Sequence, residues 1–276
     1  MAGQNVRGRA SARPFSTAWE QWGLVLLSLA VAAGALLAPP RSLLGKCDLV
    51  AYALCHRIPG HSFHLAGRQL PLCARCTGTY LGALWGLLFM GVIRRRRSSQ
   101  LPPAPILALL VVFFFLQAVD GVNSYLTLFP GFPHLYEPHN LLRFATGALN
   151  GLTISALVIP LFNSALWRAP DPHPSIRGWG EMGVMLVGAG GLMALVSLNS
   201  SALLYPLAVG SMLAVLLTLT LVNTTIIAMA TGREGGAESW SQAWTLLLSG
   251  LCLTLLEVAA LILLRGLLTH WLGFPL

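Results

Sequence analysis

Residues 55–78 read CHRIPGHSFHLAGRQLPLCARCTG, and this stretch organises the rest of the chain. It holds three of the five cysteines and three of the seven histidines of the whole sequence. The surrounding residues are mostly Leu, Ala, Val and Gly. An otherwise apolar chain thus gathers its metal-binding and redox-active side chains in one loop and the start of the following helix, which is its strongest functional signal.

The composition indicates a membrane protein. Of 276 residues, 55% are hydrophobic and only 9% are charged, and the mean hydropathy is +0.71. Soluble domains carry about 25% charged residues, so this surface cannot face water all round. The formal charge of +8 does not indicate a nucleic-acid partner, because Lys and Arg usually set the orientation of membrane proteins. The expected partner is the lipid bilayer.

We expect an all-α, polytopic integral membrane helix bundle of about seven transmembrane helices plus one interfacial amphipathic helix. Residues 43–56 are too short to span a bilayer and carry Lys46 and Asp48, so they are expected to lie at the interface. Pro206 is expected to mark a tight turn between the fifth and sixth spans. The predicted spans are residues 19–37, 71–93, 104–125, 139–162, 182–205, 206–230 and 243–265.

The chain divides into a disordered basic tail (1–17), a membrane domain with the Cys/His motif (18–165) and a C-terminal three-helix membrane segment (166–276). Because basic residues favour the cytoplasmic side, the tail, the arginines at 94–97 and those at 168, 177 and 233 predict a cytoplasmic N-terminus in the plasma membrane. The basic residues that favour the opposite orientation all belong to the motif region. The motif, the end of the third span and the start of the fourth are then extracytoplasmic.

The second span opens with Cys73 and Cys76 on its first turn, on one face with Tyr80. The free N–H groups and positive dipole of a helix start favour the thiolate, the form that binds metals or attacks disulfides. Arg75 is expected to point away from this face, toward a lipid headgroup or a neighbouring helix. The opposite face carries a stripe of small residues that permits close helix packing, namely Gly78, Gly82 and Gly86.

A second polar stripe is predicted on the fourth span. Arg143 lies about one turn inside the membrane, where an unpaired charge costs at least ~2.5 kcal/mol. It therefore needs a partner, for which Asp120 is the first choice and Gln117 and Glu137 are looser candidates. The stripe consists of Asn140, Arg143, Gly147, Asn150 and Gly151, with Thr146 at its edge.

These residues resemble the signature of a bacterial and archaeal family of predicted membrane proteins whose function is not established. The signature consists of Cys-His (55–56), Ser-Phe (62–63), Cys-Ala-Arg-Cys-Thr-Gly-x-Tyr-x-Gly (73–82), Asp-Gly (120–121) and Arg-x-x-Thr-Gly (143–147). The resemblance covers about residues 43–155. His61 departs from it, because a longer basic or polar residue is expected there, and Cys47 and His64 lie outside the pattern.

Three interpretations of the motif stay open. The first is a metal site for zinc, with Cys55, Cys73 and Cys76 as ligands and His56 or His64 as the fourth. Because adjacent residues rarely reach one ion, His56 is alternatively a base or a group that hydrogen-bonds to a ligand. The second is thiol–disulfide chemistry involving Cys47, similar to vitamin K epoxide reductase-type enzymes. The third is a structural staple, a disulfide or closed zinc site that pins the loop to the second span.

The working hypothesis is an enzyme-like site for a lipid or quinone-like substrate. Its catalytic residues would be His56, Asp120 and Arg143, with zinc or the thiols as the reactive centre. Substrate would be bound by Asn140, Arg143, Thr146 and Tyr80. Away from this site, Glu257 is expected to hydrogen-bond to Asn223 or Thr224, and Cys252 to be a buried apolar filler.

Overall fold

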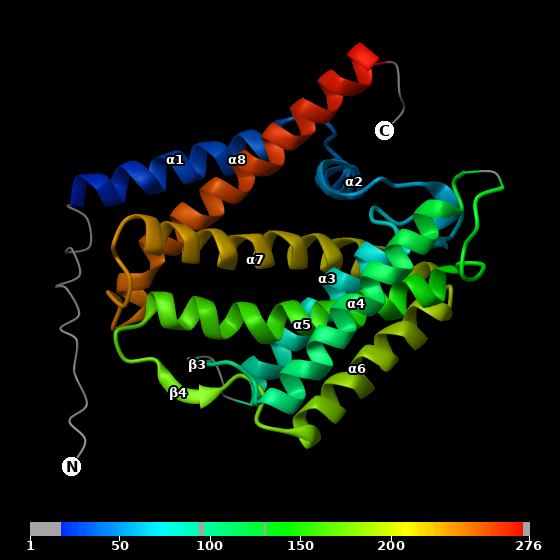
Figure 1. Cartoon of the computed structure of the whole chain (residues 1–276). Coiled ribbons are helices and arrows are strands. Elements are labelled where there is room, and N and C mark those ends of the chain that lie inside the picture. The colour runs from blue at the N-terminus through cyan, green and yellow to red at the C-terminus, as the bar shows by residue number, and fades with distance from the viewer. Residues whose placement is uncertain (1–17, 94–96, 130, 273–276) are drawn as a thin grey trace.

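A computed structural model describes residues 18–93, 97–129 and 131–272; the basic tail and the arginines at 94–96 therefore lie outside the described residues. The described chain is an all-α membrane bundle, as predicted (Figure 1). Its helices are α1 (Ala18–Leu37), α2 (Leu43–Leu54), α3 (Ala74–Val92), α4 (Ala104–Leu126), α5 (Asn140–Leu166), α6 (Trp179–Ser197), α7 (Leu204–Ala230) and α8 (Trp240–Leu272), with short 3-10 turns η1 (Pro59–His61) and η2 (Ser201–Leu203).

Strands are few and short in the described chain. In the loop before α3, β1 (His64–Leu65) pairs antiparallel with β2 (Arg68–Gln69). At the opposite end of the bundle β3 (Ser98–Gln100) pairs with β4 (Asp171–Pro174) in parallel. Sheet structure therefore only ties loops together.

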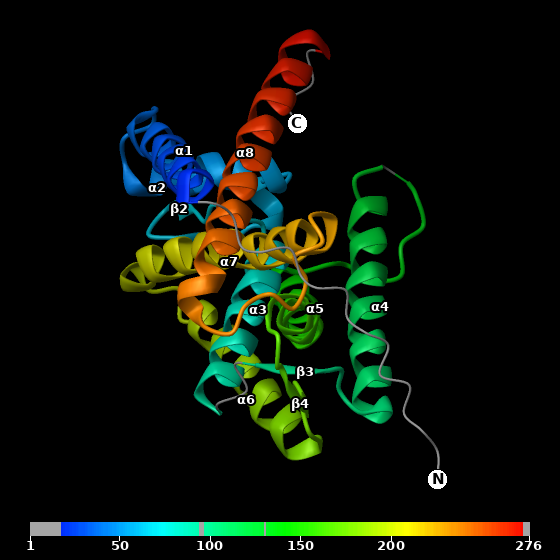
Figure 2. The same ribbon diagram turned by 90° about the vertical axis from the view of Figure 1, so that its left-hand side faces the viewer.

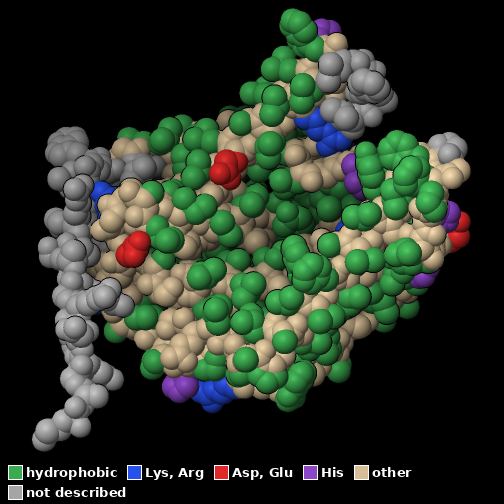
Figure 3. Space-filling view, viewed as in Figure 1, with side chains coloured by type: hydrophobic (Ala, Val, Ile, Leu, Met, Phe, Trp, Pro, Cys, Tyr) green, Lys and Arg blue, Asp and Glu red, His purple; other side chains and the backbone are tan. Residues whose placement is uncertain are grey.

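Five of the described helices are long and apolar enough to cross a membrane: α4, α5, α6, α7 with η2 before it, and α8. The seven spans expected from the sequence also include residues 19–37 and 71–93, which form α1 and α3. Hydrophobic side chains are spread over the whole face seen in Figure 3, and charged side chains are few there. On α4, Phe114 and Phe115 are exposed, whereas their neighbour Phe113 is buried. Such a surface suits lipid contact.

The bundle has two distinct ends. The loop before α3, the connection from α4 to α5 and η2 lie at one end, and β3, β4 and the connection from α7 to α8 lie at the other (Figure 1). We call the first the motif end. The helix α5 lies near the centre of the whole bundle, where Figure 2 shows it almost along its axis. The predicted meeting of the motif, the end of α4 and the start of α5 at one end is confirmed.

The turn before α7 lies earlier than expected. The chain turns at Asn199, whose φ is +48°, and at η2. Pro206 lies instead in the first turn of α7, where the missing proline N–H costs no helical hydrogen bond. The expectation that Pro206 marks the turn is therefore wrong, since proline also fits just inside a helix start.

The packing of α3 against α5 depends on glycine in both helices. A Cβ at Gly78 or Gly82 would overlap the backbone of Phe144 or Ala148 on α5. A Cβ at Gly147 would overlap the carbonyl of Arg75 on α3 in the same way. Gly86 and Gly151 continue the same contact deeper in the bundle. The predicted glycine stripe of α3 is thus met by a second stripe on α5, and the two backbones touch.

Substituting Gly147 by Ala should destabilise the protein by about 1–3 kcal/mol, because backbone atoms on α3 must move to accommodate a methyl group. The measurement is thermal unfolding of the full chain in detergent. Gly190→Ala on α6 is the matched control, because nothing lies within 4 Å of its Cβ position. Equal melting temperatures for the two variants would show that α3 and α5 are not in backbone contact.

Candidate functional site

The residue that follows α2, Cys55, is oriented by the end of that helix and by the loop beyond it. Cys55 has extended backbone and caps α2, with its N–H donating to the Ala51 carbonyl. The chain then reverses at Arg57, whose φ is +55°. On α2, Asp48 accepts hydrogen bonds from Arg57 at 2.7 Å and from Arg68 at 2.8 Å. The charge that argued against a transmembrane α2 therefore clamps the motif loop.

Arg57 also links the two ends of this loop. Its Nε donates to the Pro71 carbonyl at 3.1 Å, and its Nη1 donates to the Asp48 carbonyl at 3.3 Å. Between these ends, Gln69 donates to the Arg57 carbonyl and to the Ser62 hydroxyl. These bonds bring residues 71–73 back beside the end of α2, which places Cys73 next to Cys55.

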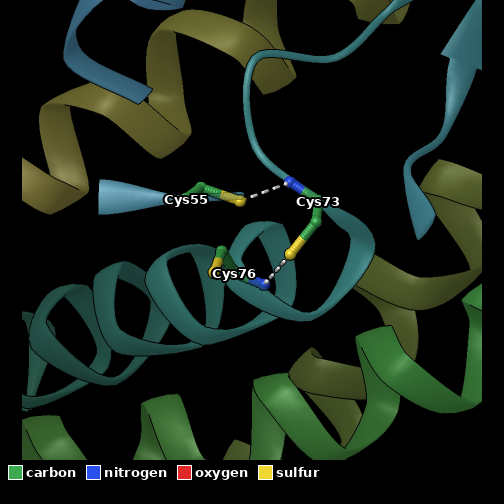
Figure 4. Close-up of side chains that lie close together, drawn as sticks. All are labelled: Cys55, Cys73 and Cys76. Atoms are coloured by element: carbon green, nitrogen blue, oxygen red, sulfur yellow. Dashed lines mark hydrogen bonds between the residues drawn. The ribbon is translucent and has the colours of Figure 1, made fainter. Parts of the chain in front are cut away.

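The sulfur atoms of Cys55, Cys73 and Cys76 all lie within 4.8 Å of one another (Figure 4). Cys55 Sγ accepts a hydrogen bond from the Cys73 N–H at 3.2 Å. Cys73 caps α3, and its Sγ accepts from the Cys76 N–H at 3.5 Å. Cys55 and Cys73 are buried, whereas Cys76 is half-buried. Such N–H donors stabilise negative charge on sulfur.

Of the three thiols, Cys55 is the one whose pKa its neighbours lower. The Cys73 and Cys76 thiols donate hydrogen bonds that hold the pKa of Cys55 far below its usual value. A thiolate is the nucleophilic and metal-binding form of cysteine. The cluster is therefore prepared to bind a cation.

The histidines of the motif lie outside the sulfur cluster. In the described chain, the three cysteine sulfurs lie close enough together to bind one metal ion, and this group does not include His56 or His64. His56 is exposed, its Nδ1 accepts a hydrogen bond from the Ile58 N–H at 3.0 Å, and its ring meets His61 edge-on. Burial, reinforced by the charge of Arg143, lowers the pKa of His61 to about 4. His64 is exposed on β1.

Asp120 was expected to pair with Arg143, but it pairs with Arg75. Its Oδ2 accepts from Arg75 Nε at 2.9 Å and from Nη2 at 2.5 Å, and its side chain is 1% exposed. Arg75 thus takes one of its two predicted destinations, a neighbouring helix. Tyr136 donates to Asp120 Oδ1 at 2.9 Å, and Thr146 Oγ1 lies 3.4 Å from Oδ2. The carboxylate is shared by α3, α5 and the loop after α4.

Arg143 binds neutral oxygens instead. It donates to Asn140 Oδ1 at 2.9 Å and to Ser124 Oγ at 3.3 Å. Asn140 donates in turn to the Ser62 carbonyl at 3.1 Å, and Ser124 also accepts from Arg75. A hydrogen-bonded network therefore runs from the motif loop through α5 and α4 to α3. Its two arginines and one aspartate sum to one positive charge.

Sequence reasoning missed Ser124 and Tyr136 as parts of this network. Asn123 holds the loop that carries Tyr136, by accepting from the Leu135 N–H and donating to the Tyr136 carbonyl. Arg75 was the signal in the sequence. Two arginines at similar depth cannot both be neutralised by one carboxylate, so they need further polar partners such as Ser124. Of the other predicted residues, Tyr80 is half-buried and packs against the hydrophobic cluster that includes the buried cysteines Cys47, Cys55 and Cys73.

The remaining candidates lie away from the sulfur cluster. Glu257 on α8 accepts a hydrogen bond from Asn223 on α7 at 2.7 Å, as predicted. Cys252 is buried on α8, as expected of a packing residue. Cys47 is buried on α2, and burial raises the pKa of its thiol. These groups stabilise helix contacts and do not extend the site.

Comparison with known proteins places the site inside a shared region. Residues 55–157 match the family described as "Predicted membrane protein (DUF2085)". An uncharacterized protein of Methanocaldococcus jannaschii is 30% identical over 123 residues, 44% of this chain and 72% of that protein. One of Methanothermobacter thermautotrophicus is 34% identical over 107 residues, 38% of this chain and 83% of that protein. No solved structure matches the chain.

Replacing Asp120 by Asn should destabilise the protein by about 3–5 kcal/mol, because Arg75 would keep a buried charge without its carboxylate. The double variant Arg75→Met/Asp120→Leu should recover most of this loss, since no buried charge of that pair remains. Thermal unfolding in detergent measures both, and Glu234→Gln at an exposed position is the charge-removal control. A double variant no more stable than Asp120→Asn would contradict the pairing.

Proposed function

This chain belongs to the DUF2085 family of predicted membrane proteins, and we propose that it is a membrane enzyme with a zinc–thiolate centre that acts on a lipid or quinone-like substrate. One observation carries the proposal: three cysteine sulfurs lie within 4.8 Å of one another. They lie at the same end of the bundle as two buried or half-buried arginines that share a network with a single aspartate. A structural staple alone has no need of that charged network.

The donor set fits zinc. Zinc binds thiolates at 2.3 Å with tetrahedral geometry, which places the sulfurs about 3.8 Å apart, and the observed sulfurs need little movement to reach this spacing. Cys55, Cys73 and Cys76 would be the ligands, and both N–H···S bonds would support them. Catalytic zinc sites typically have three protein ligands and one open position. When bound, zinc there acts as a Lewis acid or activates water.

Charge balance favours the same assignment. Three thiolates with one divalent cation would carry one negative charge, and the motif end offers it several cations, among them Arg143 and Arg265. Buried charges require such compensation. Arg143 binds neutral oxygens of Ser124 and Asn140, so its charge can also attract an anionic group of a substrate. Asn140, Thr146 and Tyr80 would line the position of that substrate.

His56 suits proton transfer better than metal binding. Because its Nδ1 accepts the Ile58 N–H, the neutral ring carries its proton on Nε2. Binding zinc through Nε2 would require the opposite tautomer. Exposed beside Cys55, the ring could instead take up a proton from solvent and, as the imidazolium, give that proton to a reacting group and return to its neutral form. Asp120 would act by holding Arg75, Thr146 and Tyr136 in place.

Thiol–disulfide chemistry is the second candidate, favoured by the same sulfur distances. Two of the three thiols could form a disulfide and pass two electrons and two protons to a quinone. A relay through Cys47 gains no support, because Cys47 is not part of the sulfur cluster in the described chain. The cluster alone would then have to receive and pass on the electrons.

Full-length protein purified under reducing conditions should contain about one zinc per chain, and Cys73→Ser should lose most of it, because one of three ligands is removed. Elemental analysis measures the metal. Cys252→Ser and Cys47→Ser are matched controls at buried cysteines outside the cluster. Zinc retained in Cys73→Ser would contradict the assignment. A metal-free wild type with one reducible disulfide among the three cysteines would favour the second candidate.

Arg143→Gln should keep its zinc but lose the response to anionic lipid. In the wild type, phosphatidylglycerol should raise the melting temperature above that in phosphatidylcholine, since a ligand at a hundredfold excess over Kd stabilises by about 2.7 kcal/mol. Arg177→Gln, at an exposed cation of the opposite end, is the control and should respond like wild type. An undiminished response in Arg143→Gln would exclude this residue as the anion-binding group.

A further inference from the structure

The C-terminal part of α8 contacts the end of α2 through Arg265. Arg265 Nη1 donates to the Tyr52 carbonyl and to the Cys55 carbonyl, each at 2.5 Å. Its guanidinium lies over the Tyr52 ring, 4.3 Å from the centroid. Tyr52 also hydrogen-bonds to Thr269 on α8 at 3.3 Å. In Figure 1 α8 passes above α2, and the two helices are in contact.

This contact supplies hydrogen-bond donors to the end of α2. The last carbonyls of a helix have no partner within the helix, and they form the negative end of its dipole. Arg is suited to this position because its planar fork binds several acceptors while its face stacks on an aromatic ring. The carbonyl of Cys55 is one of the two groups bound. Arg265 therefore holds the backbone of a residue whose sulfur belongs to the cluster.

Cys55 depends on such support more than its two partners do. Cys73 and Cys76 are held by the first turn of α3, which packs tightly on α5. Cys55 has extended backbone between the end of α2 and the reversal at Arg57. A small rotation there would carry its sulfur away from the Cys73 N–H. Nothing in α3 prevents that rotation except this one hydrogen bond and the thiol contacts.

We infer that Arg265 is a positioning residue for the cysteine cluster: α8 fixes the Cys55 backbone so that its sulfur faces the start of α3. The inference rests on the proposed role of Cys55, Cys73 and Cys76. It also assigns a purpose to the C-terminal helix, because Arg265 lies outside residues 55–157 that match the family. The site of this chain thus includes a residue from beyond the shared region.

The test compares wild type, Arg265→Gln and Arg265→Lys as full chains in detergent. The first measurement is the maleimide alkylation rate of Cys55 relative to Cys76 in zinc-free, reduced protein, read by peptide mass spectrometry. Losing hydrogen bonds from a charged donor should speed Cys55 roughly tenfold in Arg265→Gln, with partial rescue by Lys. The internal ratio removes any general loosening. Arg177→Gln is the control and should match wild type.

The second measurement is zinc affinity by chelator competition, with the absorption spectrum of the cobalt-substituted protein. Arg265→Gln should bind zinc about tenfold more weakly and show an altered thiolate–cobalt spectrum. If Arg265→Gln does not fold, Tyr52→Leu removes the stacking ring and should also accelerate Cys55. Unchanged alkylation ratios in both variants overturn the inference. A wild type that binds no zinc, but whose Cys55 is accelerated in Arg265→Gln, leaves the positioning role standing and refutes the metal centre.

Discussion

Backbone contact between α3 and α5 is the constraint on which the motif end depends. Gly147 faces the Arg75 carbonyl and Gly151 faces the Thr79 carbonyl, so the two parallel helices share one register. Both helices begin at the motif end (Figure 1). This register sets Cys73, at the start of α3, and Arg143, in the first turn of α5, at one depth. With larger residues at these glycines, Arg75 would move away from Asp120.

The same constraint explains why a charged network is tolerated in so apolar a chain. Because α3 and α5 are pressed together, Arg75 leaves their contact and extends to α4, where Asp120 and Ser124 receive it. Arg143 approaches Ser124 from α5. Two cations that share one hydroxyl repel each other, and a single carboxylate does not neutralise both. A negative charge at the same end of the bundle would relieve this repulsion, and a thiolate of the cysteine cluster could supply it.

Helical periodicity, hydropathy and charge together predicted much of this arrangement. Periodicity placed Gly78, Gly82 and Gly86 on one face of α3, and hydropathy with charge placed the motif, the end of α4 and the start of α5 at the same end. Periodicity could not decide which arginine binds Asp120, because it gives a direction around one helix and not the lateral order of its neighbours. The contacts of Arg265 could not be predicted for a related reason, since α8 and α2 bring together residues more than 200 positions apart in the sequence.

The three sulfurs are therefore not equivalent in how the fold holds them. Two are carried by the start of α3, whose position is set by glycine packing along its length. The third, Cys55, depends on separate supports at the end of α2: Asp48 with Arg57, the Arg57 bond to Pro71, and Arg265 from α8. Closure of the cluster thus requires two bodies to meet, a rigid helix pair and an adjustable helix end. A change that moves α8 against α2 would remove one of these supports and leave the α3–α5 contact unchanged.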